Sequence, residues 1–217
     1  MTSSTESTEA KSTAGHGPPG FTAERMGMFT DAVLAIAITL LVIEIKRPEG
    51  EDLASASALW HFLTHEWESF VAFVLAFFLL WSVWRRHHFF IDRVDRLTRA
   101  TAGWHAPLLL LIAFLPFPTA LIGHAFDNPL AVCVFAGTEA ALLACEAGLK
   151  ESAIRSGSVP GDPRDVRRSA SGSWAVAAFF AITGGLAWWV SHLPLVWLAA
   201  PLAAHFGGRL IERFRPR

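Results

Sequence analysis

Charge is scarce in this sequence. Only 17% of its 217 residues are Asp, Glu, Lys or Arg, whereas a soluble domain carries about 25%. Hydrophobic residues make up 53% of the chain, and its mean hydropathy is +0.39. This composition argues against a soluble globular or nucleic-acid-binding protein and favours a protein that lies in the lipid bilayer.

Residues that carry common enzyme chemistry are also few. Cys133 and Cys145 lie in one apolar run, so they predict small buried side chains rather than a disulfide framework. The pair His61 and His65 lacks a third ligand for a metal. No glycine-rich phosphate loop, zinc spacing, Gly-x-Ser-x-Gly elbow or TVGYG-like filter occurs in the sequence. We therefore expect no metal, no cofactor and no enzymatic activity.

Long apolar segments recur along the chain. Each is about 20 residues long, enough for a helix to cross a hydrocarbon core of about 30 Å. Backbone groups in lipid need internal hydrogen bonds, and no strand-like alternation is present, so the segments predict helices. The expected fold is an all-α polytopic membrane protein with six transmembrane helices, over residues 27–46, 67–86, 103–123, 129–149, 170–190 and 194–212.

Basic residues fall almost entirely on one side of these spans. The connection after the second span and the connection 150–168 each hold five, and the C-terminal end holds four. With Lys11 and Arg25, 16 of the 18 basic residues share a side, and only Lys46 and Arg47 lie on the other. The positive-inside rule then predicts that both termini are cytoplasmic, in a multi-pass protein of the cell membrane.

The two ends of the chain differ from its apolar body. Residues 1–21 are rich in Ser and Thr and contain no apolar signal-peptide core, so they predict a disordered cytoplasmic tail. Residues 22–213 form one expected six-helix membrane domain, without an internal repeat. Residues 214–217 are a short basic tail.

The first span combines an apolar stripe with a charged beginning. Ile36, Leu40 and Ile43 recur at helical spacing, and Thr39 lies beside them. Arg25 and Asp31 precede the stripe, and charged groups at a membrane edge are costly unless they are paired or hydrated. The functional interpretation is a membrane helix that binds something at its charged mouth. The structural one is helix packing with a snorkelling arginine and an N-cap.

The order of residues here resembles a known signature. Arg25-x-x-x-Phe29-Thr30-Asp31 is similar to the Arg-x-x-x-Phe-Ser-Asp signature of the transmembrane protein 175 family, the lysosomal potassium channel and its bacterial relatives. Further matches are Trp81-x-x-Trp84-x-x-His87-His88, Ile91-Asp92-Arg93-Val94-Asp95 and Leu115-Pro116-Phe117-Pro118-Thr119, so the resemblance covers residues 22–122. Two positions depart from the family: Thr30 replaces a serine, and His105 rather than an asparagine follows Trp104.

This resemblance implies a potassium-permeable cation channel, formed as a homotetramer with the first helix of each subunit lining a central pore. Carried over by position, the constriction would be Ile36, Leu40 and Ile43, with Thr39 as a hydroxyl layer. The residues expected to hold the pore mouth together are Arg25, Phe29, Thr30, Asp31, Trp81, His88 and Trp104. The expected partners are potassium ions, the lipid bilayer and further copies of the chain.

Two carboxylates inside the fourth span leave another function open. Glu139 and Glu146 are seven residues apart and so share a helical face. Ionisable residues within a membrane are functional candidates, although a structural role is favoured here. The alternative to a channel is a secondary transporter or proton pathway that uses them. A membrane enzyme is a third possibility, because Arg25, Asp31 and two histidines share the cytoplasmic side.

Overall fold

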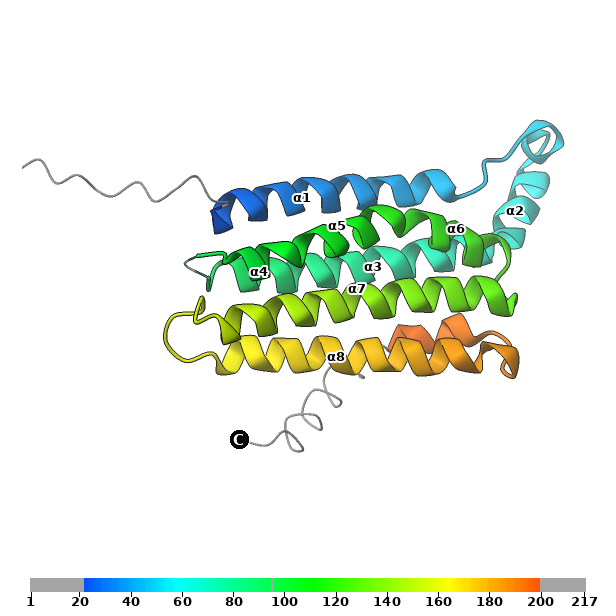
Figure 1. The fold of residues 1–217 in the computed structure, drawn as a ribbon. Coiled ribbons are helices and arrows are strands. Elements are labelled where there is room, and N and C mark those ends of the chain that lie inside the picture. The colour runs from blue at the N-terminus through cyan, green and yellow to red at the C-terminus, as the bar shows by residue number, and fades with distance from the viewer. Residues whose placement is uncertain (1–21, 95, 200–217) are drawn as a thin grey trace, which may run out of the picture.

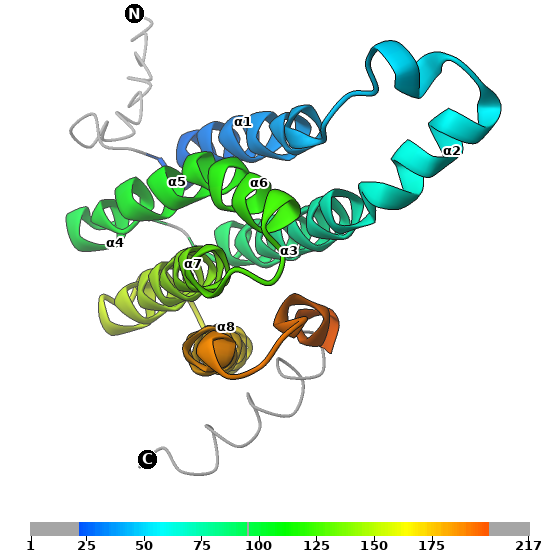
Figure 2. The same ribbon diagram turned by 90° about the vertical axis from the view of Figure 1, so that its right-hand side faces the viewer.

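The computed structural model describes residues 22–94 and 96–199, and within them every regular element is a helix. The first predicted span is α1 (Ala23–Leu40), which begins after Thr22, whose hydroxyl accepts a hydrogen bond from the backbone N–H of Arg25 at 3.3 Å. It continues as the short helix η1 (Leu41–Glu44). A link through η2 (Gly50–Leu53) leads to α2 (Ala56–His65), which projects beyond the bundle (Figures 1 and 2).

The second and third spans lie beside α1. The second is α3 (Trp67–Ile91), one helix that extends past the predicted end at residue 86. The third is divided into α4 (Arg99–Gly103), α5 (His105–Phe114) and α6 (Pro116–His124). The break before α6 falls at Pro116, because proline has no N–H to continue the helical hydrogen bonding.

The fourth and fifth spans form a long helical hairpin. α7 (Pro129–Arg155) is capped by the side chain of Asn128, and α8 (Arg164–Gly185) runs back along it. Both helices extend into the region predicted as the connection 150–168. The prediction that Lys150 lies in a loop is therefore wrong, because Glu146, one turn earlier, provides a carboxylate that keeps the buried ammonium within the helix.

The chain reverses after α8 and the short helix η3 (Leu186–Trp188). His192 has a positive φ of 53° in this turn, and η4 (Leu193–Ala199) follows. This turn lies between the predicted fifth and sixth spans, 170–190 and 194–212. The rest of the predicted sixth span lies outside the described residues, as do the tails 1–21 and 214–217.

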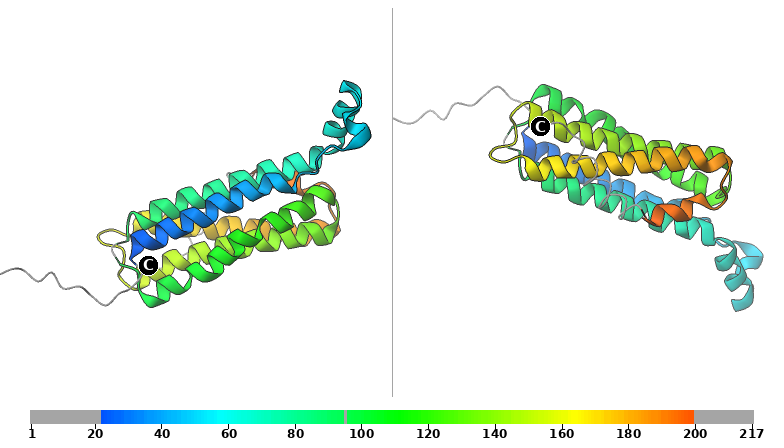
Figure 3. Two further views of the ribbon diagram at one scale, coloured as in Figure 1. Left: turned by 90° about the horizontal axis from the view of Figure 1, so that it is seen from above. Right: turned by 90° about the horizontal axis from the view of Figure 1, so that it is seen from below.

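The bundle places α7 at its centre. α7 packs against α8 on one side and against α4, α5 and α6 on the other, while α1 packs on α3 and α5 at the edge (Figures 2 and 3). Five helical segments of the described chain are long and apolar enough to cross a membrane. The described structure is thus that of a polytopic all-α membrane protein, with α1 on an outer face of the single chain.

Close helix contacts depend on two glycines. A Cβ added at Gly184 of α8 would lie 2.5 Å from the Cβ of Ala136 on α7. A Cβ at Gly148 of α7 would lie 2.9 Å from the ring of Trp104. Glycine at these positions lets the helix backbones approach closely, as small residues do in membrane bundles.

Candidate functional site

One face of α1 packs into the protein, and the opposite face does not. Thr30, Leu34, Ala37 and Leu41 are each at most 1% exposed, and they follow the helical repeat toward α3 and α5. In the most apolar window of α1 only 28% of residues are buried, against 56% in α7 and α8. Among the five candidate spans of the described residues, the first therefore has the smallest share of buried residues.

The four residues predicted to form the constriction lie together on this uncovered face. Ile36 is 60% exposed, Leu40 40% and Ile43 56%, and Thr39 is also exposed. The Thr39 hydroxyl donates a hydrogen bond to the carbonyl of Ile36 at 2.8 Å. Its oxygen keeps lone pairs that can accept a hydrogen bond from water or contact a cation.

The start of α1 packs closely against the end of α3. Thr30 is fully buried, and its hydroxyl donates to the carbonyl of Met26 at 2.9 Å. Asp31 accepts a hydrogen bond of 3.0 Å from the indole N–H of Trp84 on α3. Gly27 lies against Ile91, since a Cβ there would be 3.2 Å from that side chain. The contacts of Asp31 and Gly27 attach the start of α1 to the end of α3, whereas the Thr30 hydroxyl bonds within α1.

The other residues predicted at the pore mouth are arranged differently. Trp81 packs at a tilt against Trp84 with ring centroids 4.8 Å apart, and Trp84 stacks on His88 at 5.5 Å, so the indole that bonds Asp31 is the central ring of the three. Trp104 packs on Gly148 of α7. Arg25 and Phe29 are exposed and line a groove beside α4 and α5.

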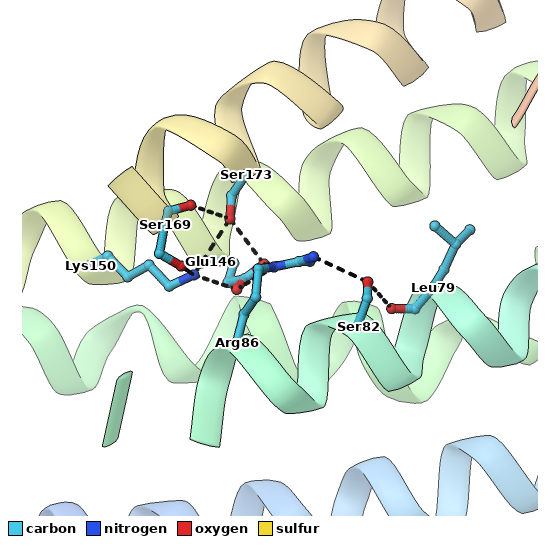
Figure 4. Close-up of polar contacts among 7 residues, drawn as sticks. All are labelled: Leu79, Ser82, Arg86, Glu146, Lys150, Ser169 and Ser173. Carbon is cyan, nitrogen blue, oxygen red and sulfur yellow. Dashed lines mark hydrogen bonds and ion pairs between the residues drawn. The ribbon is translucent and has the colours of Figure 1, made fainter. Parts of the chain in front are cut away.

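A buried charge network joins three helices near the same end of the bundle (Figure 4). Glu146 of α7 is fully buried and accepts hydrogen bonds from Arg86 of α3 at 2.9–3.1 Å, in bidentate geometry. It also pairs with the fully buried Lys150. Lys150 donates further to Ser169 of α8 at 2.9 Å, and Ser173 donates to Glu146 at 3.2 Å.

This network explains Glu146 as a structural carboxylate. A buried charge needs a partner and hydrogen bonds to offset its loss of hydration. Glu146 has both, from Arg86 and Lys150. Because two cations surround one carboxylate, the three ionised side chains together carry a net positive charge. The i,i+4 spacing of Glu146 and Lys150 in the sequence is typical of an ion pair on one helix. No sequence pattern pairs Arg86 with Glu146, because the two residues are 60 positions apart.

Three other buried ionisable side chains of the described residues, Glu139, His87 and His105, have no comparable partners. Glu139 is 1% exposed, and neither carboxyl oxygen has a hydrogen-bond partner. His87 and His105 are each 1% exposed and meet edge to face, with centroids 5.4 Å apart. Their ring nitrogens make no hydrogen bond of good geometry, although the carbonyls of Thr101 and Ala102 lie near His105. Sequence reasoning singled out Glu139 but missed the histidine pair.

Within residues 22–94 and 96–199, no group of three or more His, Cys, Asp or Glu side chains could hold a metal ion. His61 and His65 stack on each other in α2, with centroids 6.3 Å apart.

Charge differs strongly between the two ends of the bundle. The end that holds the start of α1 and the α7–α8 connection carries Arg25, Arg85, Arg93, Arg99, Arg155, Arg164, Arg167 and Arg168 (Figure 1). The opposite end carries Lys46 and Arg47 beside Glu44, Glu49, Glu51, Asp52, Glu66 and Glu68. The fold thus gathers the basic residues as the order of spans predicts.

Known proteins resemble this chain in sequence over about half of its length. Residues 25–116 match the family model of the endosomal/lysosomal potassium channel TMEM175. A potassium channel of Chamaesiphon minutus is 38% identical over 116 residues, 52% of this chain and 57% of the relative. A potassium channel of Streptomyces collinus is 36% identical over 100 residues, 46% of this chain and 47% of the relative. These alignments span about half the length of the relatives.

Solved structures resemble the fold over most of the chain. The crystal structure of a lysosomal potassium-selective channel TMEM175 homolog from Chamaesiphon minutus matches with a TM-score of 0.63 and 28% identity, covering 84% of this chain and 97% of that one. A variant of the potassium channel MtTMEM175 matches with a TM-score of 0.59 and 15% identity, covering 92% and 97%, and so supports the fold alone. The resemblance to the transmembrane protein 175 family that the signature predicts is therefore confirmed, in sequence over residues 25–116 and in fold over the described bundle.

Proposed function

We propose that this protein is a potassium-permeable cation channel of the cell membrane, with a pore formed by α1 of four subunits. The observation that carries the proposal is the outward face of α1 and η1, where Ile36, Thr39, Leu40 and Ile43 lie exposed together. The match of residues 25–116 to a potassium-channel family, and relatives named as potassium channels, support the same function.

Fourfold symmetry would turn each of these positions into a ring around the axis. Ile36, Leu40 and Ile43 would make apolar rings that strip water from a passing ion and offer no oxygen in exchange. The resulting barrier rises with the cost of dehydration, which is lower for K⁺ than for Na⁺. Thr39 would offset part of this cost through its oxygen lone pairs.

The contacts at the start of α1 would support this pore without touching the ion. Asp31 bonds Trp84, and Thr30 is buried. Both contacts lie on the side of α1 that packs into the protein, away from Ile36. Their role in the proposal is to keep α1 at a fixed rotation, so that the apolar face meets the axis.

The proposed orientation places the basic end of the bundle, and both termini, in the cytoplasm. This follows from the distribution of Lys and Arg between the two ends. The opposite end would then face outward, where Glu44 and the acidic residues after η1 attract cations toward the pore.

Ion flux in liposomes tests the proposal directly. Vesicles that contain the purified protein should pass K⁺ passively down its gradient, at a rate that needs no second ion. Under bi-ionic K⁺ and Na⁺ conditions, the reversal potential should favour K⁺. Potassium movement that requires a coupled proton or sodium gradient would contradict a channel.

A specific observation keeps a proton pathway or secondary transporter as the second candidate. Glu139 is buried in α7 without a hydrogen-bond partner, and such intramembrane carboxylates often carry protons. The same vesicles distinguish the two functions. Replacing Glu139 by Gln should leave passive K⁺ flux unchanged in a channel, and should abolish coupled transport if Glu139 carries the proton.

A further inference from the structure

A groove opens between the start of α1 and the α4–α5 segment. It has a volume of about 670 Å³. Three segments form its walls, and its lining residues are Arg25, Met26, Phe29, Arg99, Ala102, Gly103, His105, Ala106 and Leu109. The groove lies at the basic end of the bundle, where α1 and α4 both begin (Figure 1).

Two arginines give the groove its charge. Arg25 stands on the first turn of α1, and Arg99 is the first residue of α4. Both are exposed, and neither forms an ion pair with another described residue. No acidic side chain lines the groove. An anion between α1 and α4 could therefore contact both guanidinium groups, whose N–H donors suit phosphate geometry.

The remainder of the groove is apolar. Met26 and Phe29 line it from α1, and Ala106 and Leu109 line it from α5. These positions follow the helix axes away from the arginines and into the membrane-spanning part. His105, buried in the wall, lacks a hydrogen-bond partner of good geometry for its ring nitrogens. A ligand with a charged head and an apolar tail matches this order of surfaces.

We propose that this groove binds an anionic phospholipid of the cytoplasmic leaflet. Its phosphate would contact Arg25 and Arg99, and one acyl chain would lie along Phe29 and Leu109. Basic pockets between membrane helices on the cytoplasmic side bind such headgroups. The bilayer supplies this ligand to any groove that opens at its surface.

A bound lipid would connect α1 to α4 at the pore mouth. Arg25 lies two turns before Asp31, which bonds Trp84 on the other side of α1. The lipid would thus hold the beginning of α1 from the side that this hydrogen bond leaves free. The expected result is a K⁺ current that rises with the anionic lipid content of the membrane. This consequence rests on the proposed function, whereas lipid binding itself does not.

Lipid titration of the purified full-length protein tests the proposal without any flux measurement. Native mass spectrometry in mild detergent should show phosphatidylglycerol retained more strongly than phosphatidylcholine. Arg99→Gln should weaken retention about fivefold, the effect expected for one arginine near a lipid headgroup. Arg167→Gln removes an equally exposed arginine at the same end, on α8, and should leave retention unchanged.

Two further arms separate this lipid from other ligands of the groove. Ala106→Trp should fill the apolar part and reduce phosphatidylglycerol binding, while inorganic phosphate alone should bind too weakly to compete. Equal losses for Arg99→Gln and Arg167→Gln would overturn the site in favour of general surface attraction. If Ala106→Trp dissociates the subunits without changing lipid binding, the groove binds a second copy of the chain and the lipid proposal is wrong.

Discussion

Ile36 has two possible surroundings, lipid or a pore, and its substitution distinguishes them. It is 60% exposed on the open face of α1. In an apolar ring, Ile36→Asn should introduce amide groups that replace lost water, so K⁺ conductance should rise and discrimination against Na⁺ should fall. Single-channel recording under bi-ionic conditions measures both.

The matched control for this change is Ile182→Asn on α8. Ile182 is 65% exposed and lies in another membrane span. Because it is not on α1, its replacement should leave the reversal potential unchanged. A reversal potential of Ile36→Asn that equals that of the parent, at equal protein level, would remove Ile36 from the selective ring.

Glu146 is the buried residue whose loss should cost most stability. Glu146→Gln leaves Arg86 and the fully buried Lys150 without their carboxylate. Removing one partner of a buried ion pair costs about 3–5 kcal/mol. We expect a clear fall in the thermal unfolding midpoint in detergent, at unchanged ion selectivity.

Asp162→Asn is the control for the buried network. Asp162 pairs with Arg164 at 3.3 Å, and both side chains are largely exposed. An exposed pair contributes only about 0–1 kcal/mol, so this variant should unfold close to the parent temperature. Equal midpoints for the two variants would show that the network does not stabilise the bundle.

These residues also show how far sequence reasoning reaches. The stripe of Ile36, Leu40 and Ile43 could be predicted to share a face, because helical periodicity is local. The partner of Glu146 could not, since Arg86 comes from a helix 60 residues away. The same limit explains why Trp84, rather than Trp81, bonds Asp31: adjacent turns of α3 both present an indole, and only packing decides between them.

At the scale of elements, the packing of α7 on α8 depends on Gly184. A methyl group added there would lie 2.5 Å from the Cβ of Ala136. Gly184→Ala should therefore force the helices apart and cost about 1–3 kcal/mol, as overpacking does. The neighbouring Gly185 has no atom within 4 Å of an added Cβ. Gly185→Ala should consequently leave the unfolding midpoint close to that of the parent.

The attachment of α1 to α3 can be tested in the same way. Asp31→Ala and Trp84→Phe each remove the 3.0 Å hydrogen bond between them. A hydrogen bond to a charged group contributes about 1.5–3 kcal/mol. If this bond holds α1 in place, each variant should lower the thermal midpoint or the yield of assembled protein, and the double variant should add little. If Asp31→Ala instead assembles normally and changes ion selectivity, Asp31 acts on the permeating ion rather than on the position of α1.

The lengths of the elements were harder to predict than their number. Apolar runs show where a helix crosses lipid, but they do not show where it ends. α7 continues through Lys150 and α8 begins at Arg164 because charged residues can extend a helix into the interface or pair inside it. The kinked third span could be predicted, since Pro116 interrupts hydrogen bonding whatever its surroundings.

At the scale of the whole molecule, the proposed pore requires further copies of the chain. One α1 cannot enclose a pore, and a ring of identical subunits closes only at a fixed number. We expect a homotetramer, with a mass in mild detergent or lipid nanodiscs near four times the 23.7 kDa chain.

Four copies would bring Ile36 from every subunit to one axis. In a background without Cys133 and Cys145, Ile36→Cys should then form disulfide-linked dimers under oxidation, because a disulfide needs Cα atoms closer than about 7 Å. Ile182→Cys, on α8 at the other side of the chain, should remain monomeric in the same gel. Monomers alone in the mass measurement would contradict the pore, and dimers alone would contradict four subunits. Disulfide formation by Ile182→Cys but not by Ile36→Cys would show that α1 faces the lipid rather than a central pore.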